Sequence, residues 1–383
     1  MSVRELFLVV LITLDPILVT ATTLCATSIC NCYEPERGRL TVDCSDRNLT
    51  QLPVDIPLSV TYLLLDDNPH FRLRNVNWSV YEDLTSLSLE NTTAKYFNVS
   101  HLYGLTKLTS LWLSRNRIES IYGGQFSRLS GLQRLFLDRN LLQNLHPDAF
   151  IGLGNLRALN LVDNSLKNLH NMLFLPLQRL EELHLTRNRL SILDKGVFSR
   201  AKKLKRLKLN ENLISFIHKD CFRGLNELRH LDLTNSSLTK LSHQVFSNLP
   251  KLKDLYLSDN KLILDDPTAE EFFGLTELVN LDLGDNNLQR LHSAMFISLR
   301  NLKKLQLKNN NISELGHDAF TGLHALTRLV IRNNSITNLP AYVFRDLKSL
   351  KEFDLSRNLI EELDSNTFQG LFSLEILYLK ENQ

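Results

Sequence analysis

Cysteine is the residue type whose spacing first suggests chemistry in this chain. Four of the five cysteines fall within twenty residues, at Cys25, Cys30, Cys32 and Cys44. Clustered cysteines in a secreted chain predict two disulfides, for which three pairings exist, and a zinc site is the chemical alternative. No histidine lies between Cys25 and Cys44, so we favour the disulfides. The fifth, Cys221, is expected to be a buried free thiol, with an intermolecular disulfide as the alternative.

Motifs for catalysis are absent from the sequence. It has no G-x-S-x-G, no H-E-x-x-H, no glycine-rich phosphate loop and no convergent Ser, His and Asp set. We therefore predict that the chain is not an enzyme and needs no cofactor. The 44 Lys and Arg nearly balance the 42 Asp and Glu, for a net charge of +2. This balance does not suggest a nucleic-acid-binding protein.

The element that must position any functional residue is a repeat of the form L-x-x-L-x-L-x-x-N. Its asparagine recurs every 24 residues, with one interval of 26 between Asn260 and Asn286. A fixed period in this range predicts a solenoid of about 14 repeats. Thr92 and Ser236 replace the asparagine in two repeats, and the others have Asn68, Asn116, Asn140, Asn164, Asn188, Asn212, Asn260, Asn286, Asn310, Asn334, Asn358 and Asn382.

Each repeat predicts one short strand. Leu135 and Leu137 alternate with Arg134, Phe136 and Asp138, which is the period of a strand with one buried face. Such strands are too short to be stable alone, so we expect them to stack as a parallel sheet. The repeated asparagines should satisfy backbone groups at the turn after each strand, with Thr92 and Ser236 as weaker links. A phenylalanine ten residues after most asparagines should form a second ladder in the core.

The N-terminal residues 1–21 have the features of a secretory signal. Arg4 provides a positive charge, Leu6 to Leu14 is apolar, and Ala21 ends a stretch of small residues. A membrane anchor needs about 20 consecutive apolar residues, which this segment lacks. We therefore predict an extracellular chain without a transmembrane segment.

The extended pattern L-x-x-L-x-L-x-x-N-x-L-x-x-L-x-x-x-x-F-x-x-L resembles the typical extracellular class of leucine-rich repeats, found in Slit, Toll-type ectodomains and the acid-labile subunit of the insulin-like growth factor complex. The segment from Leu40 to Pro57 resembles the cysteine-rich N-terminal cap of that family. The resemblance implies a curved α/β-type solenoid, with short parallel strands on the concave face and a mostly irregular or short-helical convex side. It also implies disulfides pairing Cys25 with Cys32 and Cys30 with Cys44.

These features divide the chain into a signal peptide at residues 1–21, a cap at 22–57 and a repeat array at 58–383. The cysteine-rich C-terminal cap usual in the family has no counterpart here, so we expect a truncated array. Its last strand, around Leu377, is expected to fray or to be covered by further sequence or a partner.

The residues between the two strand leucines form a central column on the expected concave face. Trp112 and Phe136 are adjacent in it, with Arg115 and Arg139 nearby, and exposed aromatics next to arginine are typical of binding hot spots. The alternative is that the two aromatics only pack on each other. The other candidate partner-binding residues in the column are His184, Lys208, Asp232, Tyr256 and Asp282.

Charge alternates along this face. His184, Arg187, Arg206 and Lys208 are followed by an acidic run and then by further basic residues. Such alternation can steer a charged partner, although a solvated face of random charge is the alternative. We expect His184, alone on an open face, to be solvated. The acidic residues lack the spacing of a calcium loop, so we predict no metal site.

Seven sequons mark candidate N-glycosylation sites. Three of them, Asn91, Asn235 and Asn333, directly precede the ladder position, which is occupied by Thr92, Ser236 or asparagine, and glycans there would shield one edge of the concave face. The seven asparagines are Asn48, Asn77, Asn91, Asn98, Asn235, Asn311 and Asn333.

Together these features predict a secreted or cell-surface protein that binds a protein partner on its concave face. The alternatives are the truncated ectodomain of a transmembrane receptor, and a matrix component that binds collagen or proteoglycan. We expect no nucleic-acid partner.

Overall fold

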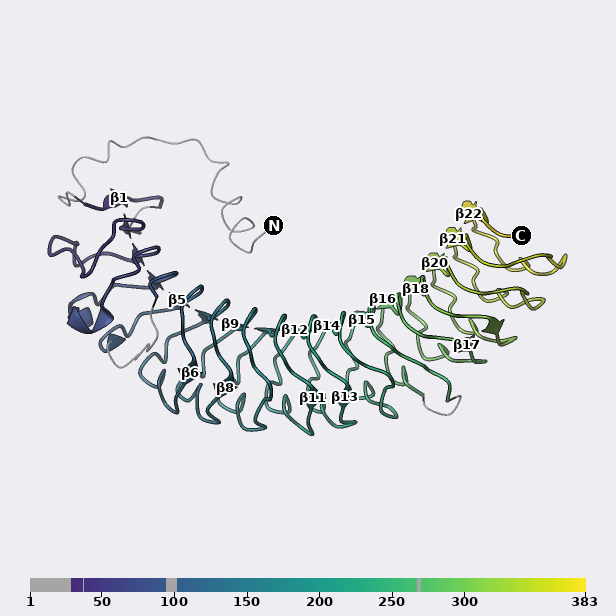
Figure 1. Cartoon of the computed structure of the whole chain (residues 1–383), viewed down its shortest axis with the longest axis horizontal. Helices are drawn as coiled ribbons and strands as arrows, with labels where there is room; N and C mark the ends of the chain where they lie inside the picture. Colours follow the sequence, from purple (N-terminus) through teal and green to yellow (C-terminus); the bar gives the residue numbers. More distant parts are fainter. Residues whose placement is uncertain (1–28, 37, 94–101, 267–269) are drawn as a thin grey trace.

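The computed structural model describes residues 29–36, 38–93, 102–266 and 270–383. They form a solenoid of about 14 turns, bent into an arc (Figure 1). A single 16-stranded sheet lines the inner, concave side of the arc, and loops with three small sheets form the outer side. The predicted curved leucine-rich repeat solenoid is therefore confirmed.

The concave sheet has one three-residue strand per turn, preceded by β1 and β2 of the N-terminal segment. All neighbouring pairs are parallel except β1 and β2, which are antiparallel. In order across the sheet the strands are β1 (Asn31–Tyr33), β2 (Thr41–Asp43), β3 (Tyr62–Leu64), β4 (Ser86–Ser88), β5 (Ser110–Trp112), β7 (Arg134–Phe136), β9 (Ala158–Asn160), β10 (Glu182–His184), β12 (Arg206–Lys208), β14 (His230–Asp232), β15 (Asp254–Tyr256), β16 (Asn280–Asp282), β18 (Lys304–Gln306), β20 (Arg328–Val330), β21 (Glu352–Asp354) and β22 (Ile376–Tyr378).

The convex side has almost no helix. Two 3₁₀ turns, η1 (Leu73–Asn75) and η2 (Trp78–Val80), lie near its N-terminal end. Three two-stranded sheets lie on this outer side: β6 (Ser120–Ile121) with β8 (Asn144–Leu145), β11 (Ile192–Leu193) with β13 (Phe216–Ile217), and β17 (Arg290–Leu291) with β19 (Glu314–Leu315).

Leucines at equivalent positions hold the turns in register. Leu111 and Leu135 are aligned in neighbouring strands, as are Leu135 and Leu159, and each of the three is at most 1% exposed. Because side chains alternate across a strand, the residues on either side of each buried leucine must point to the concave surface. A one-residue slip would reverse this arrangement, so the leucines determine which side chains a partner can meet.

The repeated asparagine connects its own turn to the preceding one through its carboxamide. Asn140 Nδ2 lies 2.9 Å from the carbonyl oxygen of Leu113 and 3.0 Å from that of Leu137, and it donates to both. Its Oδ1 accepts the amide hydrogen of Ile118 at 3.1 Å. The same pattern recurs along the solenoid, for example at Asn164 and Asn310. The carboxamides thus satisfy backbone groups that the turns leave unpaired, as predicted.

The two substituted turns differ from each other. Thr92 Oγ1 lies 3.2 Å from the carbonyl oxygen of Leu89 and 3.0 Å from Asn116 Oδ1, so it retains hydrogen-bonding partners. The Oγ of Ser236 is buried and has no hydrogen-bond partner within the described part of the chain. Ser236 is therefore the position at which the ladder is interrupted.

The phenylalanine ladder fills the core beneath the convex loops. Eight neighbouring pairs of rings have centroids 5.5 to 6.5 Å apart, and all of these are stacked except Phe320 with Phe344, which is tilted. Trp78 and Leu102 occupy the same position in the first turns and are buried. In the last described turn, Phe368, Leu371, Leu374, Leu377 and Leu379 pack against the core but are only partly buried.

The N-terminal end of the sheet carries a disulfide between Cys30 and Cys44, one of the two pairings that the resemblance implies. Cys32 is also disulfide-bonded, whereas its predicted partner Cys25 lies outside the described residues. The antiparallel strand β1 covers the edge of β2, which would otherwise expose unpaired backbone groups. The predicted signal peptide at residues 1–21 and the sequon at Asn98 also lie outside the described residues.

Cys221 is free and buried, as predicted. Its position corresponds to that of Ala149 and Ala319, so it packs as a small apolar residue. Within the described residues, no helix is both long and apolar enough to cross a membrane.

Candidate protein-binding surface

The concave surface is built from two columns of side chains that flank the buried strand leucines. We call the residues before these leucines the first column and the residues after them the central column. In register, the central column places Trp112 beside Phe136, His184 beside Lys208, and Asp232 beside Tyr256. Strand spacing puts neighbours within about 5 Å, so each residue contacts the turns on both sides.

Trp112 and Phe136 form a parallel stack. Their ring centroids are 5.4 Å apart and their planes differ by 3°. Both side chains are partly buried rather than fully exposed. Each ring therefore covers one face of the other, and the pair presents a two-residue apolar platform on the concave surface.

Arg115 and Arg139 lie three residues after the two aromatics, where the chain leaves the strand. Both have left-handed backbone geometry, with φ of 58° and 55°. The residue before the ladder position has this geometry in every turn from Asp67 to Glu381. From Asp67 to Arg357, each amide there donates to a carbonyl of the next turn, as Arg115 does to Asp138 at 2.9 Å, which compensates the strained conformation.

Asp138 connects the strands around the aromatic pair. Its carboxylate accepts hydrogen bonds from Ser114 Oγ at 2.7 Å and from Asn160 Nδ2 at 3.0 Å. Burial raises the pKa of Asp138, while the Ser114 hydrogen bond and the charges of Arg139 and Arg115 oppose this. The hydrogen bonds fix the turns on either side of Phe136, so the aromatic platform rests on a rigid support.

His184 differs from the solvated residue that we expected. Its side chain is only 20% exposed, and its Nε2 is buried without a hydrogen-bond partner in the described residues. Burial lowers the pKa of His184 to about 4, helped by the charges of Lys208, Arg206 and His230. The prediction was wrong because the closely spaced neighbouring strands shield the ring. His184 is therefore neutral at physiological pH.

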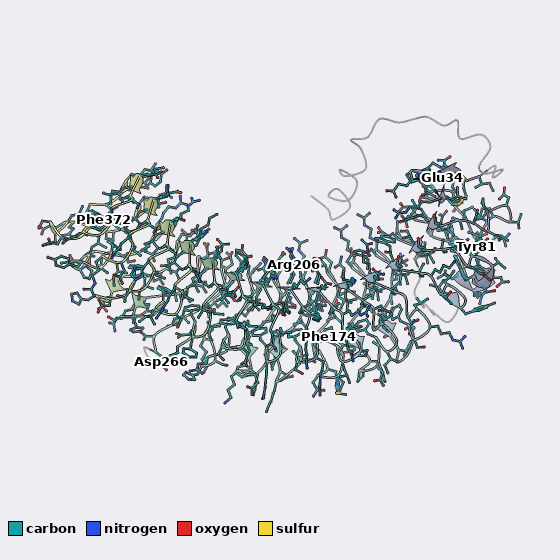
Figure 2. All side chains as sticks on the ribbon, turned by 180° about the vertical axis from the view of Figure 1, so that it is seen from behind. Glu34, Tyr81, Phe174, Arg206, Asp266 and Phe372 are labelled. Carbon is teal, nitrogen blue, oxygen red and sulfur yellow. A yellow bond between two sulfur atoms is a disulfide. The ribbon has the colours of Figure 1, made fainter. Side chains whose placement is uncertain are left out.

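The charges of the predicted basic stretch are partly compensated. Arg187 lies between two carboxylates, 2.7 Å from Glu211 and 3.9 Å from Asp163. Arg206, labelled near the middle of the arc in Figure 2, is 4.0 Å from Glu182. Lys208 makes no ion pair within the described ranges. The basic character of this area is consequently weaker than the sequence alone suggested.

An acidic area follows, with a tyrosine at its centre. Tyr256 is aligned between Asp232 and Asp282 on the neighbouring strands. Burial raises the pKa of Tyr256, and the charges of Asp254, Asp232 and Asp282 add to this effect. The phenol therefore remains protonated and can donate a hydrogen bond to a partner.

His230 belongs to this area and was missed in the sequence analysis. Its ring lies 5.3 Å from that of Tyr256, and its Nδ1 is 3.7 Å from a carboxylate oxygen of Asp254. The proximity of His230 is the largest influence that lowers the pKa of Asp254. His230 lies in the first column, whereas only the central column was considered. The register of the repeat places it opposite Asp254 and was the available signal.

The repeat pattern matches a known family model. The model described as leucine rich repeat matches residues 82–142, 106–166, 178–236, 227–283, 276–335 and 325–383, which together exceed half of the chain. This chain belongs to the leucine-rich repeat family. A second model, the leucine rich repeat N-terminal domain, matches residues 25–57.

Among curated proteins, the chain is similar to leucine-rich repeat-containing protein 3B of Homo sapiens. The two are 30% identical over 99 residues, which is 26% of this chain and 38% of that protein. The match thus spans well under half of the relative.

Solved structures cover more of the leucine-rich repeat array. The TLR13 chain in the TLR13–ssRNA13 complex superposes with a TM-score of 0.70 at 29% identity, over 84% of this chain and 50% of that one. A leucine-rich repeat protein of Leptospira interrogans gives a TM-score of 0.68 at 29% identity, over 89% of this chain and 78% of that one. The structural neighbours are thus Toll-type and other leucine-rich repeat proteins.

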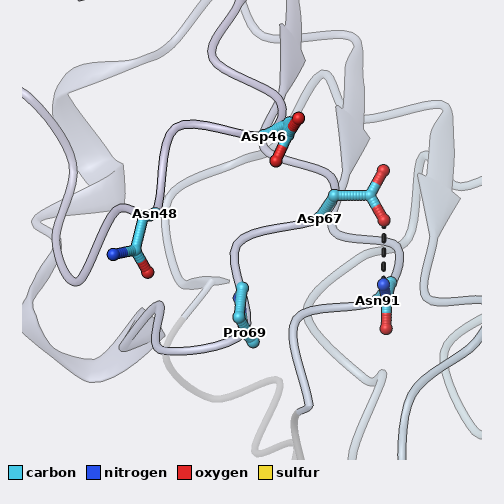
Figure 3. A pocket seen from close by; sticks show the side chains of 5 residues that line it. All are labelled: Asp46, Asn48, Asp67, Pro69 and Asn91. Carbon is cyan, nitrogen blue, oxygen red and sulfur yellow. Dashed lines mark hydrogen bonds between the residues drawn. The ribbon is translucent and has the colours of Figure 1, made fainter.

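The loops that follow the strands form one flank of the leucine-rich repeat solenoid, which we call the post-strand flank. Near its N-terminal end lies an open hollow of about 530 Å³ lined by Asp46, Asn48, Asp67, Pro69 and Asn91 (Figure 3). Asn91 Nδ2 donates to Asp67 Oδ1 at 2.8 Å across one turn. Two of the seven sequon asparagines thus border the same hollow.

The sequon asparagines are accessible wherever the structure describes them. All six are exposed. Asn91, Asn235 and Asn333 occupy the left-handed position before the ladder, which asparagine tolerates better than most residues. As for metals, no group of three or more His, Cys, Asp and Glu side chains in the described ranges is placed to hold an ion.

Proposed function

We propose that this chain is an extracellular leucine-rich repeat protein that binds another protein through its concave face. The observation that carries this proposal is the Trp112–Phe136 stack. The two rings are partly exposed, and apolar surface of this kind often marks an interaction site, at which large aromatic anchors supply much of the binding free energy. Arg115 and Arg139 would border this anchor and add polar contacts at its rim.

A second contact area would select the partner by charge. Asp232, Tyr256 and Asp282 lie side by side and present two carboxylates around a phenol. His184 and Lys208 precede this area along the same column. A partner with lysines or arginines placed to meet the carboxylates would bind faster and in one register.

Several observations support the extracellular location. Residues 25–57 match the N-terminal cap model, and a disulfide joins Cys30 to Cys44 within it. Disulfides persist mainly in oxidising compartments. We therefore propose that residues 1–21 direct secretion, that residues 22–57 form the cap, and that the array at 58–383 is the binding module.

Glycans would restrict the direction of approach. Carbohydrate on Asn91, Asn235 and Asn333 would project from the post-strand flank and leave the centre of the sheet open. Mass spectrometry of the secreted protein tests this part, and unmodified asparagines at all three positions would remove it.

The experiment that tests the binding proposal compares two double variants of the secreted protein. The first is Trp112→Ala with Phe136→Ala. The matched control is Ile192→Ala with Phe216→Ala, because these apolar residues are also aligned on neighbouring turns but lie on the convex side, each 44% exposed. Both variants are tested against partners selected by screening the wild-type protein on an array of extracellular proteins.

We expect the concave double variant to lose affinity by about 2 kcal/mol or more, which corresponds to roughly thirtyfold. The convex control should retain wild-type affinity, and both should be secreted in similar amounts. Equal affinities of the wild type and the concave variant would refute the proposal, as would an equal loss in both variants.

A further inference from the structure

The flank opposite the sequon-bearing loops carries a concentration of positive charge that the concave-face proposal does not use. This flank comprises the segments that lead into the strands. In four consecutive turns these segments are residues 175–181, 199–205, 223–229 and 247–253, which we call the basic flank. They contain nine basic and two acidic residues, in a chain whose net charge is only +2.

The solenoid aligns these charges along one line. Arg229 N donates to the carbonyl oxygen of Lys205 at 2.8 Å, and Lys253 N donates to that of Arg229 at 2.9 Å. The three residues therefore follow one another on adjacent turns, separated by about 5 Å. All three side chains are exposed. Arg206, labelled in Figure 2, directly follows Lys205 and marks the place of this line in the arc.

The two acidic residues of the basic flank are already engaged. Glu181 lies 2.6 Å from Lys205 and 2.7 Å from Arg157, and Glu227 lies 2.8 Å from Lys251. The Lys251 hydrogen bond is the main cause that lowers the pKa of Glu227, and the charges of Lys203 and Arg229 contribute.

The remaining cations lack such partners. In the described part of the chain, no carboxylate lies within ion-pair distance of the exposed side chains of Arg200, Lys202, Lys203, Arg229 and Lys253. Like charges held this close repel one another, so an added anion would be bound favourably.

The residue types of the basic flank indicate which class of polyanion it would bind. Nucleic-acid single strands are usually bound on aromatic side chains, against which the bases stack. None of the four segments contains a Phe, Tyr or Trp residue. A linear polymer recognised by charge alone fits this surface better. No sequon falls within these segments, so glycans would not originate there.

We propose that the basic flank binds a sulfated glycosaminoglycan chain, which lies across the turns from Arg179 to Lys253. Its sulfate and carboxylate groups contact the lysines and arginines. Extracellular location, part of the function proposed above, brings the protein into contact with such chains. The concave face remains free, so the protein can hold a glycosaminoglycan and its protein partner together.

The test uses the purified full chain, a size-defined heparin oligosaccharide and a biosensor at physiological salt. The flank variant is Lys202→Gln, Lys203→Gln and Arg229→Gln. The control variant is Arg117→Gln, Arg189→Gln and Lys261→Gln, which removes the same charge from exposed residues on the post-strand flank. Hyaluronan, which lacks sulfate, and a polyuridylate RNA are tested as alternative ligands.

We expect the oligosaccharide to bind the wild type and the control variant alike, and the flank variant to bind about tenfold more weakly with a smaller dependence on salt. Hyaluronan should bind weakly. Equal losses in both variants would show that only bulk charge matters, and tighter binding of the RNA would show a nucleic-acid site. Either result, or absence of heparin binding, overturns the proposal. The Trp112→Ala and Phe136→Ala variant should bind heparin normally, which separates this outcome from failure of the concave-face proposal.

Discussion

Asn140 Nδ2 donates a hydrogen bond to the carbonyl oxygen of Leu113, 27 residues earlier, across a distance of 2.9 Å. The same carboxamide also donates to Leu137 and accepts from Ile118. Replacing Asn140 by alanine would leave the amide of Ile118 without its acceptor and would remove one of the two carboxamide donors from each carbonyl, because Leu113 also accepts from Asn116 and Leu137 from Asn164. We expect Asn140→Ala to lower the free energy of unfolding by about 3 kcal/mol, measured by urea denaturation.

The control for this prediction is Asn144→Ala in the same turn. Asn144 is exposed, so its replacement should change the free energy of unfolding by less than about 0.5 kcal/mol. Similar effects of the two substitutions would contradict a structural role for the ladder.

Ser236 offers the reverse experiment. Its Oγ is buried without a partner, and a carboxamide at this position would reach the carbonyl oxygens of Leu209 and Leu233 if it followed the pattern of Asn260. We expect Ser236→Asn to raise the free energy of unfolding by about 1 kcal/mol or more. The substitution keeps the sequon at Asn235, because Ser237 remains in place. An unchanged or lower urea midpoint would show that the larger side chain does not fit.

The fold could be predicted because one spacing determines it. The 24-residue interval from Asn140 to Asn164 predicts one turn of a solenoid. The alternation of apolar and other residues around Leu135 shows which side chains face the core. The small outer sheets, such as β6 with β8, were not foreseen because two-residue strands leave no periodic pattern. The left-handed backbone at Arg115 and Arg139 was also missed, since these residue types do not favour it.

The sequence predicted which residues of the candidate site are neighbours, but not how their side chains pack or how deeply they are buried. The adjacency of Trp112 and Phe136 follows from the repeat length, whereas their parallel stacking depends on side-chain packing across the strands. His184 was expected to be solvated because the sequence does not show how closely the neighbouring strands enclose it. His230 and Asp254 form a pair only through the strand register. The burial and the pairing of single side chains such as these follow only from the three-dimensional structure.

The buried ring of His184 predicts a loss of stability in mild acid. Its pKa in the folded protein is about 4, below the ordinary value of 6.5 for histidine. Between these values the unfolded chain binds a proton that the folded chain does not, so stability falls as the pH decreases through this window. For His184 alone, the loss from about pH 7 to about pH 5 is roughly 2 kcal/mol.

The measurement is the difference in unfolding free energy between neutral and mildly acidic pH, for the wild type and His184→Gln. We expect the variant to lose less stability on acidification than the wild type. His146→Gln is the control, because the side chain of His146 is 50% exposed. This variant should lose as much unfolding free energy between neutral and mildly acidic pH as the wild type does. An identical pH dependence for all three proteins would show that His184 titrates normally in the folded state.

Cys221 provides a test of the packing in the middle of the solenoid. Its side chain is fully buried, and burial strongly raises the pKa of its thiol, so the reactive thiolate is scarce in the folded protein. We expect no labelling by a maleimide under native conditions and one label per chain in urea.

Cys221→Ala should be tolerated, because alanine occupies the same position at Ala149 and Ala319. We expect it to lower the free energy of unfolding by about 1 kcal/mol. Cys221→Ser should lose more, since its hydroxyl would be buried among apolar side chains. Rapid native labelling, or a dimer on non-reducing electrophoresis that disappears in Cys221→Ala, would instead place this thiol at the surface of the protein.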